Sequence, residues 1–149
     1  MKPLALLAFA ALLALPACGG DVDPASTPAG RAQVQLLDDL YNGRFGAAYD
    51  DLHPSHQNLV PRALFIRCAR ETIPTGKLDS IEILDVFDDE TRAPLVGGEP
   101  TKGVRVRLTF TDGQSTEPFV NHELKDGGRY YWMLNQKAID AYQAGRCAQ

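Results

Sequence analysis

The chain has 149 residues, a formal net charge of −4 at pH 7 and three cysteines. This length suffices for one domain with a short flanking segment, and it is too short for two domains. The acidic balance, without any cluster of lysines and arginines, argues against a nucleic-acid partner.

The first 18 residues are organised like an export signal. Lys2 precedes an apolar run from Leu4 to Leu15, and small residues follow that run. About twelve apolar residues are too few to span a bilayer comfortably, so a transmembrane helix is the weaker interpretation. The segment Leu15-Pro16-Ala17-Cys18 resembles the lipobox of bacterial lipoproteins, although Pro16 departs from the small or apolar residue usual there.

In such lipoproteins the signal is cut before the cysteine, and that cysteine carries the lipid. The resemblance implies that residues 1–17 are removed, that Cys18 is lipidated, and that the protein lies on the extracytoplasmic side of the cell membrane. Several acyl chains, at about 0.8 kcal/mol for each buried methylene, hold a protein at a membrane almost permanently. An ordinary signal peptide followed by an incidental cysteine is the alternative.

Residues 18–30 are expected to form a flexible tether between the membrane and a single domain over residues 31–149. This segment contains prolines, glycines and aspartates, and Val22 is its one large apolar residue. Loss of Lys2 with the signal changes the net charge of the mature chain to −5.

Cys68 and Cys147 are the other two cysteines, and we expect them to form a disulfide bond because an exported chain meets an oxidising compartment. Closing a loop of about 80 residues stabilises the folded state by roughly 4.5 kcal/mol in the chain-entropy model. Two free buried thiols are the alternative. The chain has no Cys-x-x-Cys spacing, so the cysteines indicate neither redox chemistry nor a zinc cluster.

Three apolar patterns with helical spacing come before the first strand. The first covers residues 32–41 and ends at Asn42-Gly43, and the second covers residues 45–52 and ends against Pro54. The third is expected to begin at Pro61, to present Phe65 and Cys68 inward, and to end near residues 72–76.

Residues 104–110 alternate apolar and polar side chains, which is typical of a strand with one buried face. Another strand is predicted at residues 78–87, where the alternation breaks near residues 83–85. A bulge at this break would re-phase the strand and bend the sheet. Residues 90–103 contain two prolines and a Gly-Gly pair, and they are expected to form a loop.

Two hairpins follow. Asp112-Gly113 is expected to turn the chain into a return strand over residues 116–124, in which Pro118 marks an edge or a bulge. Asp126-Gly127-Gly128 leads to the last strand at residues 129–134. Asn135 is a plausible N-cap for a short final helix that ends at Gly145.

This order predicts an α+β fold in which N-terminal helices pack on a curved, mostly antiparallel four-stranded sheet, with a short C-terminal helix. The order, the helix pair around Gly43-Arg44-Phe45 and Tyr49, and the strand ending in Tyr131-Trp132 resemble the nuclear transport factor two-like superfamily, which has a cystatin-like cone. More narrowly, the chain looks like the small exported lipoproteins of that fold. The resemblance covers residues 31–143 and implies a cone whose mouth often holds a small apolar ligand. Some members of the superfamily are isomerases or dehydratases.

Asp85 and His122 are the candidate catalytic residues, because enzymes of this fold need a carboxylate or a histidine inside the cone, where desolvation shifts its pKa. Asp85 shares strand parity with Ile83 unless the bulge turns it away, and His122 lies between Val120 and Leu124. The two side chains in one apolar pocket could move a proton next to a carbonyl group. A solvated aspartate and a structural histidine are the alternative.

A cluster with metal-ligand residue types is formed by Asp50, Asp51, His53 and His56. The two histidines flank Pro54 and do not share one continuous helix face, so we expect a solvated helix end and no metal site. The chain contains neither a phosphate-binding glycine loop nor a nucleophile elbow, and no cofactor is expected.

Five aromatic residues could line the pocket, although most are expected in the core: Tyr41, Tyr49, Phe65, Phe110 and Trp132. The first hypothesis is a lipid-anchored cell-envelope protein whose domain binds, without catalysis, a small apolar ligand or an envelope protein. The second is a proton-transfer enzyme of the isomerase or dehydratase type. A structural or inhibitory domain with a filled core is a third. Two ionisable groups in a deep cavity would favour the enzyme, and an apolar cavity would favour a ligand carrier.

Overall fold

Four antiparallel strands form a meander in which each strand pairs with the next one along the chain. The structure is a computed structural model that describes residues 22–92 and 100–148. Its strands are β1 (Leu78–Arg92), β2 (Pro100–Phe110), β3 (Phe119–Asp126) and β4 (Arg129–Trp132). Helices precede this sheet and a short helix follows it, so the predicted α+β fold is confirmed.

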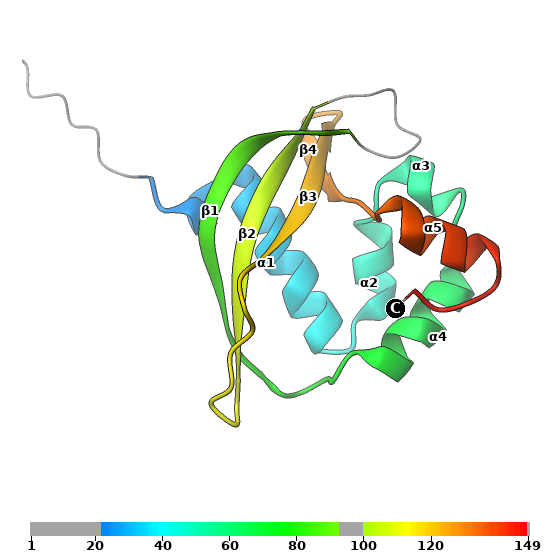
Figure 1. Cartoon of the computed structure of the whole chain (residues 1–149), viewed down its shortest axis with the longest axis horizontal. Helices are drawn as coiled ribbons and strands as arrows, with labels where there is room; N and C mark the ends of the chain where they lie inside the picture. Colours follow the sequence, from blue (N-terminus) through cyan, green and yellow to red (C-terminus); the bar gives the residue numbers. More distant parts are fainter. Residues whose placement is uncertain (1–21, 93–99, 149) are drawn as a thin grey trace, which may run out of the picture.

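Strand β2 has one buried face, as its alternating sequence predicts. Val104 is fully buried and Leu108 is 2% exposed, whereas Arg105 next to Val104 is exposed. The register between β1 and β2 shifts between Ile83 and Asp85, where the sequence predicts a bulge. A bulge bends the strand that carries it, and the sheet is visibly curved in Figure 1.

Helix α1 (Pro28–Tyr41) lies across the concave face of the sheet (Figure 1). Thr27 caps its first turn by accepting a hydrogen bond from the Gly30 amide at 3.0 Å. Leu36 and Leu37 are buried on this helix, and Leu37 belongs to the core that α1 shares with β1 and β2. The helix therefore covers one face of the sheet, as the sequence predicts for the N-terminal helices.

The expectation of a flexible tether up to residue 30 is wrong for residues 24–30. A 3₁₀ helix, η1 (Pro24–Ser26), precedes α1, and Asp23 caps it by accepting a hydrogen bond from the Ala25 amide at 3.0 Å. The contact between η1 and α1 is so close that a Cβ atom added to Gly30 would lie 2.1 Å from the Pro24 carbonyl oxygen. Composition suggested a tether, but two local caps fold this segment onto the domain.

Four short helices form a group beside α1 (Figure 1), which we call the helical corner: α2 (Phe45–Asp50), α3 (Pro54–Gln57), α4 (Arg62–Thr72) and α5 (Gln136–Gln143). Its core centres on Phe65, whose ring centroid lies 5.6 Å from that of Tyr49 and 5.8 Å from that of Trp132. Cys68 and Cys147 form the predicted disulfide bond, with 5.3 Å between their Cα atoms. The bond ties the end of the chain to α4.

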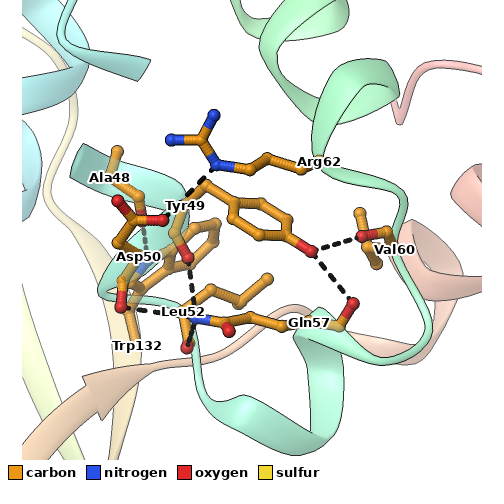
Figure 2. A network of polar contacts seen from close by, with 8 residues as sticks. All are labelled: Ala48, Tyr49, Asp50, Leu52, Gln57, Val60, Arg62 and Trp132. Atoms are coloured by element: carbon orange, nitrogen blue, oxygen red, sulfur yellow. Dashed lines mark hydrogen bonds and ion pairs between the residues drawn. The ribbon is translucent and has the colours of Figure 1, made fainter. Parts of the chain in front are cut away.

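Hydrogen bonds from side chains to backbone carbonyls also hold the helical corner together (Figure 2). The Tyr49 hydroxyl lies 2.9 Å from the Gln57 carbonyl oxygen and 2.7 Å from that of Val60, so both oxygens accept from its single proton. The Trp132 indole donates to the Ala48 carbonyl at 2.7 Å. This last bond fixes the end of β4 against α2.

The loop predicted at residues 90–103 is shorter than expected. β1 continues to Arg92 and β2 begins at Pro100, and Asp88 stands opposite Lys102 in the register of the two strands. The Lys102 ammonium lies 2.5 Å from the Asp88 carboxylate, and a cross-strand charge pair of this kind stabilises the pairing of β1 with β2. The prolines and glycines of this stretch predicted a loop and did not indicate this pairing. Residues 93–99 lie outside the described residues.

β3 begins at Phe119 rather than at residue 116, because Pro118 has no amide hydrogen for the ladder. Among residues 22–92 and 100–148, every helix is too short or too polar to cross a membrane. The signal peptide over residues 1–17 and the lipidation site Cys18 lie outside the described residues, and they stay predictions.

Candidate functional site

A pocket of about 480 Å³ lies between α1 and the β3–β4 hairpin. This volume falls within the range typical of small-molecule sites. Apolar, polar and charged side chains from several elements meet in its wall. The lining residues are Pro28, Arg31, Ala32, Gln35 and Leu36 of α1, Asp51 after α2, Glu123 of β3, and Gly128, Arg129, Tyr130 and Trp132 of the hairpin.

Glu123 is the buried acidic residue of this wall and is 1% exposed. In the sheet it stands opposite Trp132 of β4 on one side and Lys102 of β2 on the other. Neither of its carboxyl oxygens has a hydrogen-bond partner among the residues that the structure describes. A buried polar group without a partner costs free energy, so its presence here calls for a reason.

Burial raises the pKa of Glu123 to about 8, and the negative charge of Asp51 acts in the same direction. The carboxyl group is therefore protonated at neutral pH and titrates slightly above it. A carboxyl group with this pKa can release or accept a proton under mild conditions, which is what a general acid or base requires.

Asp51 and Arg129 form an ion pair in the same wall. Burial raises the pKa of Asp51, and the positive charge of Arg129 opposes that rise. The Arg129 side chain is 56% exposed, so the pair lies close to solvent. The pocket thus holds two carboxyl groups, and a cation of the protein is paired with Asp51 but not with Glu123.

Trp132 lines the pocket, whereas the other four predicted pocket aromatics do not. Tyr49 and Phe65 lie in the core of the helical corner. Tyr41 and Phe110 contact each other in the core between α1 and the sheet, with 5.8 Å between their ring centroids. These four aromatic side chains therefore belong to the two hydrophobic cores and not to the pocket.

The candidate pair Asp85 and His122 does not meet in this pocket. The bulge in β1 places Asp85 opposite Arg105, and its side chain is exposed. His122 is adjacent to Glu123 in β3 and so points to the opposite face, where its Nδ1 lies 3.4 Å from an Asp89 carboxylate oxygen. The two side chains are therefore not brought together in one cavity, because the bulge re-phases β1 and strand alternation turns His122 to the opposite face.

His53 and His56 are buried, at 4% and 0% exposure, so the expectation of a solvated helix end is wrong. His53 caps α3, a helix that sequence patterns did not predict, by accepting a hydrogen bond from the Ser55 amide at 3.2 Å. His56 accepts one from the Leu134 amide at 3.2 Å. Burial lowers the pKa of His53, and the neighbouring His56 acts in the same direction.

The two aspartates of that cluster point elsewhere. Asp50 lies 3.4 Å from the Arg62 guanidinium, and Asp51 pairs with Arg129. Among the described residues, no group of three or more histidine, cysteine, aspartate or glutamate side chains is arranged to hold a metal ion. The four residues therefore serve the structure of the helical corner and the wall of the pocket.

Sequence reasoning missed Glu123. It shares strand parity with Asn121 and Lys125, so its pattern is that of a solvated face, and its burial depends on α1, which is remote in the sequence. Comparison of the chain with protein-family models, with curated proteins and with solved structures finds no match. Function is therefore inferred from the chemistry of the pocket.

Proposed function

We propose that this chain is a lipid-anchored protein of the cell envelope whose domain binds a small molecule in the pocket between α1 and the β3–β4 hairpin. One observation carries the binding proposal: the pocket wall contains Glu123, buried and without a hydrogen-bond partner among the described residues. Proteins rarely leave a carboxyl group in this state unless a ligand or a reaction uses it.

The fold supports a relation to the nuclear transport factor two-like superfamily as part of this proposal. Helices precede a four-stranded meander, and α1 lies on its concave face (Figure 1). In that superfamily the ligand enters a cone between helices and sheet, which corresponds to the side of the sheet where the pocket lies. The charged residues in the lining favour a ligand with a polar group over the small apolar ligand that such a cone often holds.

Binding is tested by native mass spectrometry of the protein purified from its own membrane. We expect a bound small molecule in the wild-type protein and none in Ala32→Phe, which places a ring in the pocket from α1. Ala47→Phe is the matched control, because Ala47 is exposed on α2 and lies outside the pocket lining. A wild-type protein free of any bound molecule, or one that binds equally in Ala32→Phe, would contradict the proposal.

The membrane anchor is tested separately, because Cys18 lies far from the pocket residues in the sequence. We expect the mature protein to begin at Cys18, to carry acyl chains in intact-mass measurements and to sediment with membranes. Cys18→Ser should release it into the soluble fraction while its fold persists. An unmodified, soluble wild-type protein would disprove the anchor and leave the pocket proposal standing.

Proton transfer is a second candidate function, favoured by the pKa of about 8 at Glu123. In this reaction the Glu123 carboxylate takes a proton from the carbon next to a carbonyl group and returns a proton to the product. Deuterium exchange into the methylene group of phenylacetone in D₂O, followed by NMR, tests it. Exchange should be accelerated by the wild-type protein and not by Glu123→Gln, and equal rates would exclude this role.

A further inference from the structure

The cations around Glu123 are all engaged with other groups. Asp51 from the end of α2 is the one other acidic residue in the pocket lining, and it pairs with Arg129. Six positive side chains come from the elements packed around Glu123: Arg31 on α1, Lys102, Arg105 and Arg107 on β2, Lys125 on β3 and Arg129 on β4. Arg105 lies over the Phe87 ring and Arg107 pairs with Glu82, which leaves four to consider. The question is whether any of them compensates the buried carboxyl group.

None of the four does so among the described residues. Arg31 donates to the Ser26 carbonyl, and Lys102 lies 2.5 Å from the Asp88 carboxylate. The Lys125 ammonium lies 6.0 Å from the centroid of the Tyr130 ring. With Arg129 on Asp51, the two carboxyl oxygens of Glu123 have no donor among residues 22–92 and 100–148.

An aromatic wall adjoins this carboxyl group. Trp132 stands directly opposite Glu123 in the β3–β4 ladder, and both Trp132 and Tyr130 line the pocket. Aromatic faces attract organic cations as well as apolar groups. Leu36 and Pro28 add apolar surface from α1. A ligand that contacts both Glu123 and this aromatic surface therefore carries an apolar or aromatic body and a positively charged hydrogen-bond donor.

We propose that the pocket binds a small organic amine in its ammonium form, with its apolar body against Trp132 and its charge on the Glu123 carboxylate. This inference rests on the proposed binding function and specifies the ligand class. The carboxyl oxygens are covered in the present conformation, so binding turns the side chain toward the pocket by rotation about its own bonds. The ammonium then replaces the proton that the buried carboxyl group holds at neutral pH.

Trp132 provides the readout, because it is the only tryptophan of the chain and lines the pocket. Three probes share one aromatic body and differ in charge: phenethylamine is a cation, 2-phenylethanol is neutral, and 3-phenylpropionate is an anion. Each is titrated into the full mature protein while the fluorescence of Trp132 is recorded. At about pH 8 we expect phenethylamine to bind at least about tenfold more tightly than 2-phenylethanol and the anion to bind most weakly.

The pH profile separates this site from a nonspecific apolar pocket. Because Glu123 has a pKa of about 8 and must lose its proton, the affinity for phenethylamine should rise by up to about tenfold for each pH unit between about 6 and 8. The affinity for 2-phenylethanol should not change in this range. Glu123→Gln should bring phenethylamine to the affinity of 2-phenylethanol and abolish the pH dependence, with binding of 2-phenylethanol retained.

The outcomes are distinguishable. Fluorescence changes with all three probes at equal affinity, tighter binding of the anion, or loss of both phenethylamine and 2-phenylethanol in Glu123→Gln would overturn the amine inference and leave a binding pocket. No response to any probe in the wild-type protein would also overturn the amine inference, whereas the proposed binding function is overturned by a protein that carries no bound molecule in native mass spectrometry. Glu117→Gln, which removes an exposed carboxyl group outside the pocket, is the matched control and should behave as the wild type.

Discussion

The helical corner and the pocket both contain buried polar side chains, and the two regions differ in the hydrogen bonds that these side chains make. In the helical corner the Tyr49 hydroxyl meets two carbonyl oxygens, and His56 accepts a backbone amide (Figure 2 shows the tyrosine). In the pocket the Glu123 carboxyl group meets no donor from the described residues. A satisfied buried group contributes to stability and specifies the packing, whereas an unsatisfied one lowers stability. This difference is the reason why we propose a ligand site in the pocket and not in the helical corner.

The largest effect is expected from removing the covalent link of the helical corner. The double substitution Cys68→Ser and Cys147→Ser opens a loop with a sequence separation of 79 residues. Chain entropy predicts a loss of about 4 kcal/mol in the free energy of unfolding, measured by urea denaturation. A loss below about 1 kcal/mol would show that the apolar core around Phe65 holds the C-terminal helix without the bond.

The second prediction concerns the unpaired carboxyl group of the pocket: Glu123→Gln should raise the free energy of unfolding. The folded state holds the Glu123 proton up to pH about 8, whereas the unfolded chain releases it near pH 4.5. Between these values the folded state binds the extra proton, so wild-type stability falls as pH rises, and this loss is complete above pH 8. Glutamine mimics the protonated carboxyl group and does not titrate.

Urea denaturation of both proteins across this range measures the effect. The difference between Glu123→Gln and the wild type should be near zero around pH 4.5 and should reach roughly 4 kcal/mol in favour of the variant at pH 8. Glu117→Gln serves as the control with an exposed carboxyl group. A destabilised Glu123→Gln at pH 8 would mean that the carboxylate has a partner in the folded protein and that the contrast between the two regions is wrong.

A smaller effect tests the satisfied network. Tyr49→Phe removes the hydroxyl that serves the carbonyl oxygens of Gln57 and Val60, and we expect a loss of about 1 kcal/mol in the free energy of unfolding. Tyr41→Phe is the matched control, because Tyr41 packs against Phe110 and no hydrogen bond of its hydroxyl is found among the described residues. Equal losses in the two variants would show that the network adds nothing beyond ring packing.

The sequence predicts the parts of this fold that depend on local patterns. Val104 and Leu108 follow strict alternation, the break near Ile83 marks a real bulge, and Asn135 caps α5 by accepting from the Ala138 amide at 2.8 Å. The cysteine pair was predictable because, once Cys18 is assigned to the predicted lipobox, Cys68 and Cys147 have one pairing to make. Each of these predictions rests on a short segment of the sequence or on the number of cysteines.

The site depends on contacts between segments that no local pattern connects. Glu123 looks like a surface residue until α1, which lies some ninety residues earlier, covers that end of β3. Asp85 and His122 looked catalytic because parity was counted along single strands, and the bulge changed that parity for Asp85. His53 and His56 flank a proline and looked solvated, yet the short helix α3 buries both against β4 and its following loop. Tertiary packing decides burial for Glu123, His53 and His56, whereas the bulge in β1 decides it for Asp85.

The smallest effect concerns the ion pair between Asp51 and Arg129, which distinguishes the carboxyl group of Asp51 from that of Glu123. Arg129 is largely exposed, so Arg129→Gln should lower the free energy of unfolding by less than about 1 kcal/mol, and added salt should shrink the difference.

The effect of Arg129→Gln on the titration of Asp51 is more informative. Arg129 lowers the pKa of Asp51, so the variant should raise the pKa of Asp51, which NMR titration of the carboxyl carbons can measure. Lys125→Gln is the control, since Lys125 and Arg129 both lie over tyrosine rings of the hairpin but only Arg129 pairs with Asp51 among the described residues. If Arg129→Gln left the titration of Asp51 unchanged while altering that of Glu123, the arginine would serve Glu123 instead, and the pocket would lack the uncompensated acceptor on which its ligand preference depends.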